Sequence, residues 1–275
     1  MAPSSAFRDL PCALTIAGSD SGGGAGIQAD LKTLAAHGVH GLSAIAALTA
    51  QNTRAVSAVH VPPVGFLRAQ IDACFDDFSI GAVKLGMLAN AAVIHAVADA
   101  LEAYRPRFVV LDPVMVATSG AKLLEDDALD ALRTRLLPLA SIVTPNIPEA
   151  ELLTGIGVGD AGSAMRAMHA LRTMGAKSIL LKGGHLDEGD VVVDRYADAD
   201  ANVAFMHARL PLEAHGTGCT LASAIAANLC LGLSMPEAAR AASDYVGRAL
   251  RLGTRPGRGD IVVLDHSGAA PPERR

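Results

Sequence analysis

The sequence predicts an α/β protein in which helices cover both faces of a mostly parallel central sheet. Short apolar runs alternate with longer segments of helical periodicity along nearly the whole chain, and repeated strand–helix units favour parallel strands with right-handed crossovers. Most of the short runs are continuously apolar, which is typical of strands buried on both sides. With 275 residues, 51% of them hydrophobic, the chain can bury a core without disulfides or a structural metal.

The strands follow from the short apolar runs, and the last two runs have no helical segment between them. We therefore expect residues 191–208 to form an antiparallel hairpin or an addition at the sheet edge. In chain order, the expected strands are Ala13–Ala17, Leu42–Leu48, Val56–Val61, Ala82–Leu85, Phe108–Leu111, Ile142–Thr144, Ile179–Lys182, Val191–Tyr196 and Ala204–Ala208.

The helices follow from apolar residues that recur every three or four positions. Val93, Val97 and Leu101, for example, lie on one face of the helix expected over residues 89–103. In chain order, the expected helices are Ile27–Ala36, Val64–Phe78, Ala89–Ala103, Asp126–Leu136, Ile147–Leu153, Ser163–Met174, Thr220–Leu231 and Pro236–Leu252.

No long linker and no internal repeat divides the chain, so we expect a single domain over residues 1–275. The low-complexity tail after Leu264 and the start of the chain are expected to be frayed, at about residues 1–11 and 265–275. No formally charged side chain occurs from Ala214 to Pro236, but the apolar part of this segment is too short to cross a bilayer. We expect a buried helix there and no membrane span.

Charge and cysteine usage narrow the class of protein further. The chain has 23 Lys and Arg against 28 Asp and Glu, a formal charge of −5, and only 3% aromatic residues, which argues against nucleic acid or an anionic membrane as a partner. The four cysteines form no C-x-x-C pair and no zinc-site cluster. This pattern indicates reduced thiols in a cytoplasmic protein.

A first glycine-rich loop, residues 18–26, joins the first expected strand to the first helix. Gly24, Gly26 and Ala29 satisfy the pattern G-x-G-x-x-G/A of dinucleotide-binding sites, which also requires an acidic residue about 20 positions further on. None occurs between Asp30 and Asp72, so a dinucleotide site is disfavoured. The chain also contains no G-x-x-x-x-G-K-[ST] motif, which excludes a P-loop.

A second glycine-rich segment, His215–Thr220, leads directly into an apolar helix. Glycines before a helix leave its first N–H groups open, and with the helix dipole these form an anion site. Cys219 would be favoured there as a thiolate that acts as base or nucleophile. A small buried thiol beside a helix start is an equally good interpretation at this stage.

Polar residues also follow three of the expected strands, at Asp112, at Asn146 with Glu149, and at Lys182. Each has a structural explanation, such as a turn, a helix N-cap or a solvated strand end. Together they supply the carboxylates, the lysine and the anion-binding helix end that phosphoryl transfer with Mg²⁺ requires. In an open α/β sheet, ligands bind at this carboxyl edge.

These segments resemble hydroxymethylpyrimidine/phosphomethylpyrimidine kinase of thiamine biosynthesis, in the expected order and from residue 13 to about 250. The motifs are A-G-S-D-S-x-G-G-A-G-I-Q-A-D-L at Ala17–Leu31, A-L-T-A-Q-N-T at Ala47–Thr53, K-L-G-M-L at Lys84–Leu88, D-P-V-M-V-A-T-S-G at Asp112–Gly120, T-P-N-I-P-E-A at Thr144–Ala150, K-G-G-H at Lys182–His185 and H-G-T-G-C-T-L at His215–Leu221. One departure is Gly22, where the family usually has serine, and the missing hydroxyl could alter loop mobility.

The resemblance implies a three-layer ribokinase-like fold and two successive ATP-dependent phosphorylations. The first converts 4-amino-5-hydroxymethyl-2-methylpyrimidine to its monophosphate, and the second converts the monophosphate to the diphosphate. By resemblance, the protein is also expected to form a homodimer.

The resemblance also implies roles for individual residues. Gln51 would bind the amino and ring edge of the pyrimidine, in a pocket lined by Gly18, Ala25, Met87 and Val114. ATP and Mg²⁺ would be bound by Asp112, Asn146, Glu149 and Lys182, with Asp112 and Glu149 serving the metal directly or through water. Gly216, Gly218 and Cys219 would form the anion hole, with Cys219 as the catalytic base and Lys182 on the ATP phosphate.

Two alternatives remain open beside this interpretation. A pyridoxal or pyridoxine kinase has the same fold and reaction class, although Gln51 and Met87 favour a pyrimidine ring. A non-catalytic sensor of a thiamine precursor would retain the pocket, but it would need none of Asp112, Glu149, Lys182 and Cys219.

Overall fold

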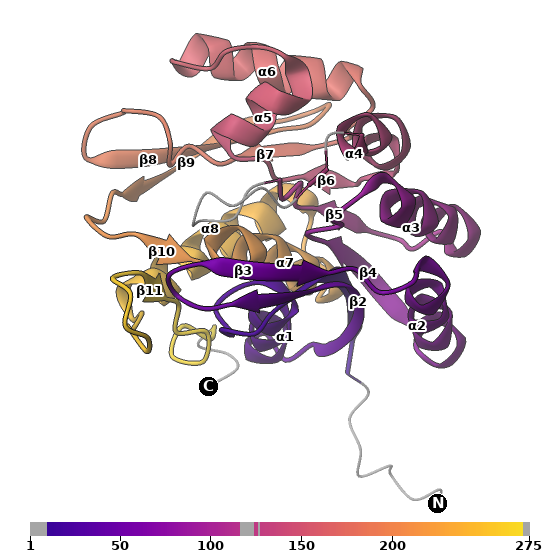
Figure 1. Ribbon diagram of the computed structural model, residues 1–275. Helices are drawn as coiled ribbons and strands as arrows, with labels where there is room; N and C mark the ends of the chain where they lie inside the picture. The colour runs from indigo at the N-terminus through magenta and orange to yellow at the C-terminus, as the bar shows by residue number, and fades with distance from the viewer. Residues whose placement is uncertain (1–9, 116–123, 126, 272–275) are drawn as a thin grey trace, which may run out of the picture.

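The computed structural model describes residues 10–115, 124–125 and 127–271, and Figure 1 shows how they are arranged. Its main sheet has nine strands in the order β3-β2-β1-β4-β5-β6-β7-β8-β9, and β10 and β11 form a separate pair. The strands are β1 (Cys12–Asp20), β2 (His40–Gln51), β3 (Val56–His60), β4 (Ile80–Leu85), β5 (Val109–Leu111), β6 (Ile142–Val143), β7 (Ile179–Leu181), β8 (Val191–Ala197), β9 (Asn202–Ala208), β10 (Ala214–His215) and β11 (Val262–Val263).

Helices follow most of the strands, as the alternating pattern predicts. They are α1 (Gly26–Ala36), α2 (Val64–Asp77), α3 (Ala91–Tyr104), α4 (Ala128–Ala131), α5 (Ile147–Thr154), α6 (Ala161–Thr173), α7 (Thr217–Cys230) and α8 (Met235–Arg251). The helix expected over residues 126–136 is shorter than predicted: α4 passes into a π-helical turn at Leu132–Leu136 and a 3₁₀ turn at Leu137–Leu139. Asp126 itself lies outside the described residues, as do residues 116–120 of the motif that begins at Asp112.

The continuously apolar strands are buried on both faces, which confirms their interpretation. Val83 and Leu111 belong to the apolar cluster under α2, α3, α5 and α6, whereas the neighbouring Ala82 and Val110 belong to the cluster under α7 and α8. Alternate residues of one strand therefore pack into two different helix layers, and Figure 1 shows these helices on the two sides of the sheet. The expected three-layer α/β class, with a mostly parallel sheet, is confirmed.

Three strands at the ends of the sheet run antiparallel to their neighbours. β3 pairs antiparallel with β2, and β8 and β9 form the antiparallel hairpin expected for residues 191–208 at the other edge. The short pair β10–β11 was not predicted, because two-residue strands carry no periodicity. It joins Ala214–His215 to Val262–Val263 and thereby positions His215 directly before α7.

The expectation of a frayed C-terminal end is wrong for the residues that the structure describes. His266 and Ala269 are buried, and Tyr245 on α8 donates a hydrogen bond to the His266 carbonyl oxygen at 2.9 Å. Small apolar residues in this tail pack on α8, which composition alone did not reveal. Residues 1–9 and 272–275 lie outside the described part, and Leu10 is exposed.

Candidate active site

A cavity of about 520 Å³ opens at the carboxyl edge of the parallel strands. Every residue that the sequence analysis assigned to substrate, nucleotide, metal or catalysis lines this cavity. They are Gly18, Ala25, Gln51, Met87, Asp112, Val114, Asn146, Glu149, Lys182, Gly216, Gly218 and Cys219. The structure thus brings the whole predicted site together, while the role of each residue stays a prediction.

The parallel strands bring these side chains together because each strand delivers its next residue to the same edge. Asp112 directly follows β5, and Lys182 directly follows β7. Asn146, shortly after β6, forms a parallel bridge with Lys182. Gln51 ends β2 on the other side of β1. The cavity therefore lies where ligands bind in open α/β sheets.

A lysine and two carboxylates occupy the centre of this edge. Lys182 Nζ lies 2.9 Å from Asp112 Oδ1 and 3.6 Å from Glu149 Oε2, and both carboxylates are almost fully buried. Burial alone would lower the pKa of Lys182, but the two carboxylates outweigh it and raise that pKa above its ordinary value. Burial raises the pKa of Glu149, against the opposing effect of Lys182.

Asn146 and Glu149 also form a helix N-cap, which the sequence analysis gave as a purely structural explanation for these two residues. Asn146 Oδ1 accepts a hydrogen bond from the Glu149 N–H at 2.8 Å, and Glu149 Oε2 accepts one from the Asn146 N–H at 2.7 Å. This capping box begins α5. Since the same Glu149 oxygen faces Lys182, the cap holds a carboxylate in the cavity, and the structural and functional interpretations are compatible.

The first turn of α7 faces the lysine and its partner Asp112. A Cβ atom built on Gly218 would lie 3.0 Å from Lys182 Nζ and 3.3 Å from Asp112 Oδ2. Gly216 has φ +86°, and a Cβ there would meet the Gly24 carbonyl oxygen at 1.9 Å, so only glycine fits. No side chain caps this helix start, so its first N–H groups can bind an anion at the cavity.

The expectation of a thiolate at Cys219 is wrong, because the pKa of this thiol is raised and not lowered. Burial raises the pKa of this thiol to about 11; Lys84 and a backbone hydrogen bond from Gly26 lower it, while Asp30 and Asp112 raise it further. The helix start is therefore not sufficient to ionise the thiol at neutral pH, because desolvation and two nearby carboxylates oppose its charge.

Lys84 lines the cavity and was not singled out as a site residue. It is 1% exposed, and its Nζ lies 2.9 Å from both carboxylate oxygens of Asp30, which is fully buried. Asp30 also accepts hydrogen bonds from Thr15 on β1 and Ser223 on α7. A lysine inside an otherwise apolar strand was the signal in the sequence that could have revealed this buried ion pair.

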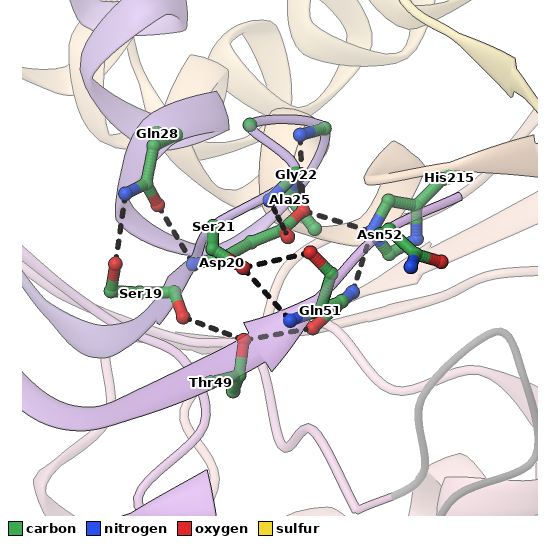
Figure 2. A network of polar contacts seen from close by, with 12 residues as sticks. Ser19, Asp20, Ser21, Gly22, Ala25, Gln28, Thr49, Gln51, Asn52 and His215 are labelled. Carbon is green, nitrogen blue, oxygen red and sulfur yellow. Dashed lines mark hydrogen bonds and ion pairs between the residues drawn. The ribbon is translucent and has the colours of Figure 1, made fainter. Parts of the chain in front are cut away.

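Asp20 and His215 also line the cavity and were not assigned a role in advance. Figure 2 shows that His215 lies between Asp20 and Gln51: its Nε2 atom is 3.1 Å from Asp20 Oδ2 and 2.9 Å from Gln51 Nε2. Asp20 ends β1, so the strand-end rule could have indicated it. The contact between Gln51 and His215 joins residues 164 positions apart, which no local pattern shows.

The carboxylates of Asp112 and Glu149 fit a magnesium ion held mainly by nucleotide phosphates. Mg²⁺ in kinases is bound by one or two carboxylates together with phosphate oxygens and water, not by a complete protein cage. The part of the chain that the structure describes contains no group of three or more His, Cys, Asp or Glu side chains placed to hold a metal.

The family model of phosphomethylpyrimidine kinase matches residues 20–264 of the chain. The thiamine biosynthesis bifunctional protein ThiED of Geobacter sulfurreducens is 52% identical over 247 residues, which cover 90% of this chain. The chain spans only 50% of that relative's length. The hydroxymethylpyrimidine/phosphomethylpyrimidine kinase of Rhizobium meliloti is 49% identical over 255 residues, with 90% of this chain and 95% of that protein covered.

Solved structures agree with this similarity. A crystal structure of phosphomethylpyrimidine kinase from Clostridium difficile is 42% identical with a TM-score of 0.77, covering 86% of this chain and 97% of that chain. The pyridoxal kinase of Staphylococcus aureus, in complex with AMP-PCP and pyridoxal, is 31% identical with a TM-score of 0.87, covering 95% of each chain. Among the helices of the described ranges, none is long and apolar enough to cross a bilayer. By the extent of these matches and its ribokinase-like fold, the chain belongs to the phosphomethylpyrimidine kinase family.

Proposed function

We propose that this chain transfers the γ-phosphoryl group of ATP to 4-amino-5-hydroxymethyl-2-methylpyrimidine, and then a second phosphoryl group to the monophosphate, in thiamine biosynthesis. The observation that carries the proposal is that Gln51, the start of α7 and Lys182 all line one cavity. This cavity places a carboxamide able to read an aminopyrimidine beside groups able to bind transferring phosphate.

In the first reaction, the hydroxyl oxygen of the pyrimidine forms a bond to the γ-phosphorus of ATP. The bond from that phosphorus to the β–γ bridging oxygen breaks, and ADP leaves. The N–H groups at the start of α7 and the Lys182 ammonium stabilise the charge on the phosphoryl oxygens. Asp112 and Glu149 would hold Mg²⁺, which would neutralise phosphate charge.

Cys219 receives the hydroxyl proton in this proposal, and only its thiolate form can do so. Because its pKa is about 11, the thiolate is a minor species at neutral pH. Phosphoryl transfer depends more on positioning and electrostatics than on a base, so a minor thiolate is compatible with turnover. In the second reaction the attacking phosphate oxygen is already ionised and needs no base.

The test is ATP consumption, measured in parallel with hydroxymethylpyrimidine, its monophosphate and pyridoxal. We expect hydroxymethylpyrimidine to exceed pyridoxal in kcat/KM by at least about tenfold, which corresponds to about 1.4 kcal/mol. ADP and the pyrimidine diphosphate should accumulate as products. An equal or inverted ratio would contradict the pyrimidine assignment.

Pyridoxal phosphorylation is the second candidate function. It is favoured by the likeness to the Staphylococcus aureus pyridoxal kinase, whose structure holds pyridoxal and AMP-PCP. The curated relatives at 46–49% identity that this chain matches along most of their length are instead named for the pyrimidine substrate. Gln51 within its motif and Met87 at the cavity wall also favour the pyrimidine.

We also propose that the protein acts as a homodimer in the cytoplasm. The dimer rests on the resemblance to the kinase family, because the exposed Leu48 and Val59 of β2–β3 lie on opposite faces of the strand pair: Leu48 pairs with His60, and Val59 pairs with Thr49. The four cysteines are all free thiols, as is usual in a reducing compartment. Light scattering that gives the mass of one chain would contradict the dimer.

A further inference from the structure

A chain of polar contacts surrounds the carboxamide of Gln51. Its Nε2 atom lies 2.9 Å from His215 Nε2, and its Oε1 atom lies 3.1 Å from Thr49 Oγ1. His215 Nε2 is also 3.1 Å from Asp20 Oδ2, and Thr49 Oγ1 is 2.9 Å from the Ser19 carbonyl oxygen. Figure 2 shows this chain from β1 across β2 to His215. Each end of the carboxamide therefore has a neighbour whose hydrogen-bonding character can be worked out.

Asp20 is a pure acceptor. Its carboxylate accepts backbone N–H bonds from Gly22, Gly24 and Ala25 at 2.8, 3.0 and 2.9 Å. Burial would raise its pKa, but the hydrogen bonds from His215 and the backbone lower that pKa below its ordinary value. An ionised carboxylate has no proton to donate. The facing His215 Nε2 must therefore carry a proton, whether the imidazole is neutral or charged.

Thr49 determines which group of the Gln51 carboxamide, the oxygen or the NH₂ group, faces the other side. Its hydroxyl has a single proton, and the Ser19 carbonyl oxygen can only accept that proton. The hydroxyl oxygen is then left as an acceptor toward Gln51. With Nε2 of Gln51 toward His215, two donors would face each other, and the one proton of Thr49 would serve two acceptors. A half-turn of the carboxamide, which exchanges its oxygen and its NH₂ group, removes both conflicts. The NH₂ group then donates to Thr49 Oγ1, and the carboxamide oxygen shares the Nε2 proton of His215 with Asp20 Oδ2.

We propose that His215, held by Asp20, is the positioning residue that turns the Gln51 oxygen toward itself and thereby selects the substrate edge. With its orientation set, Gln51 has one acceptor lone pair left on the His215 side and one N–H donor left on the Thr49 side. The matching ring has an exocyclic amino group next to an unprotonated ring nitrogen, with the amino group on the His215 side. This inference rests on the proposed function, since it specifies how that pyrimidine is read.

A ring with the reversed edge should be rejected. The 4-oxo analogue of hydroxymethylpyrimidine carries a carbonyl oxygen and a ring N–H. Its carbonyl oxygen would face the oxygen of the oriented Gln51, and its ring N–H would face the Gln51 NH₂ group. Pyridoxal has no amino group beside a ring nitrogen and cannot form the pair at all. His215 thus contributes to specificity without touching the transferred phosphoryl group.

The test compares His215→Leu, which removes the N–H donor, with His215→Gln, whose NH₂ group can replace the donor at Nε2. Binding and kcat/KM are measured for the 4-amino and 4-oxo rings. We expect wild type to prefer the amino ring by at least about tenfold, His215→Leu to reduce that preference to within about threefold, and His215→Gln to restore it. An unchanged preference in His215→Leu would overturn the proposal, as would a His215→Gln variant that behaves like His215→Leu.

A second measurement does not depend on substrate. Nitrogen-15 NMR of the histidine rings reports which ring nitrogen is protonated, and the His215→Leu spectrum identifies the signal by its loss. We expect a proton on Nε2 of His215 at pH 8, and a proton confined to Nδ1 would overturn the proposal. If wild type phosphorylates neither ring, the proposed function fails, while the NMR result still decides the orientation of Gln51.

Discussion

Replacement of Cys219 by alanine should remove a pH-dependent part of the first phosphorylation. The thiol lines the cavity, and its pKa is about 11. Because a base must be deprotonated to act, the contribution of Cys219 should rise with pH and reach its maximum above pH 11. Lys84 and Lys182 have pKa values raised by their carboxylate partners. They stay charged across the same range and should not produce the rise.

The size of the effect follows from the thiolate fraction. With a pKa of about 11, the thiolate is about 0.1% of the enzyme at pH 8 and about 10% at pH 10. A general base contributes about 10²–10⁴-fold when fully ionised. The deficit of Cys219→Ala should therefore be at most about tenfold at pH 8 and about 10–10³-fold at pH 10. The second phosphorylation should show no such rise, since phosphate is ionised above pH ~6.

The assay is single-turnover rapid quench with saturating ATP and Mg²⁺ between pH 7 and 10. Cys230→Ala is a matched control, because Cys230 lies on the same helix α7, its pKa is also raised to about 11 by burial, and it does not line the cavity. We expect the wild type and this control to gain up to about tenfold per pH unit once the Cys219 contribution exceeds the background rate, reaching about 10–10³-fold above Cys219→Ala at pH 10, and Cys219→Ala to give a flat profile. A flat profile in wild type, or an equal slope in Cys219→Ala, would refute the base assignment.

Three further substitutions test other parts of the site. Gln51→Ala should weaken pyrimidine binding by about 1–3 kcal/mol with the KM for ATP unchanged, and calorimetry showing equal pyrimidine affinity would remove Gln51 from the site. Gly216→Ala should lower the free energy of unfolding by more than the ~1–2 kcal/mol of left-handed strain and abolish turnover, because its Cβ would meet a carbonyl oxygen at 1.9 Å. Gly232→Ala is the control, since Gly232 has φ +93° with open space around it. It should lose only the free energy of the strain and retain activity. Lys84→Met should lower the free energy of unfolding in urea by about 3–5 kcal/mol, because it leaves the carboxylate of Asp30 buried and unpaired, and a loss below 1 kcal/mol would show that water or a second cation replaces it.

Much of the fold could be predicted because it depends on local pattern. Apolar runs buried on both faces identified the inner strands of the main sheet, and the absence of a helix between the last two runs identified the β8–β9 hairpin. The end of each strand then indicated where Asp112, Asn146 and Lys182 would meet. The sheet brings such residues to one edge whenever strands run parallel, so sequence position alone was sufficient.

The pair β10–β11 and the buried tail at His266 were decided only by tertiary structure. Both depend on contacts between segments distant in the chain: Ala214 pairs with Val262, and Tyr245 bonds to the His266 carbonyl oxygen. Two-residue strands and a tail of small residues have no periodicity that could indicate these partners.

The pKa values and side-chain orientations in the site could not be predicted from the sequence. The helix start before Cys219 was correctly located, but the sequence does not reveal the extent of burial or the nearby carboxylates of Asp30 and Asp112, and these decide the pKa of the thiol. The orientation of Gln51 likewise depends on His215 and Asp20, which are brought together only by folding. The sequence by itself determined that Asp112, Asn146 and Lys182 would reach the cavity, because the end of each strand is marked by a local pattern. Only the tertiary structure decided their charge and orientation, because both depend on what surrounds each group in space.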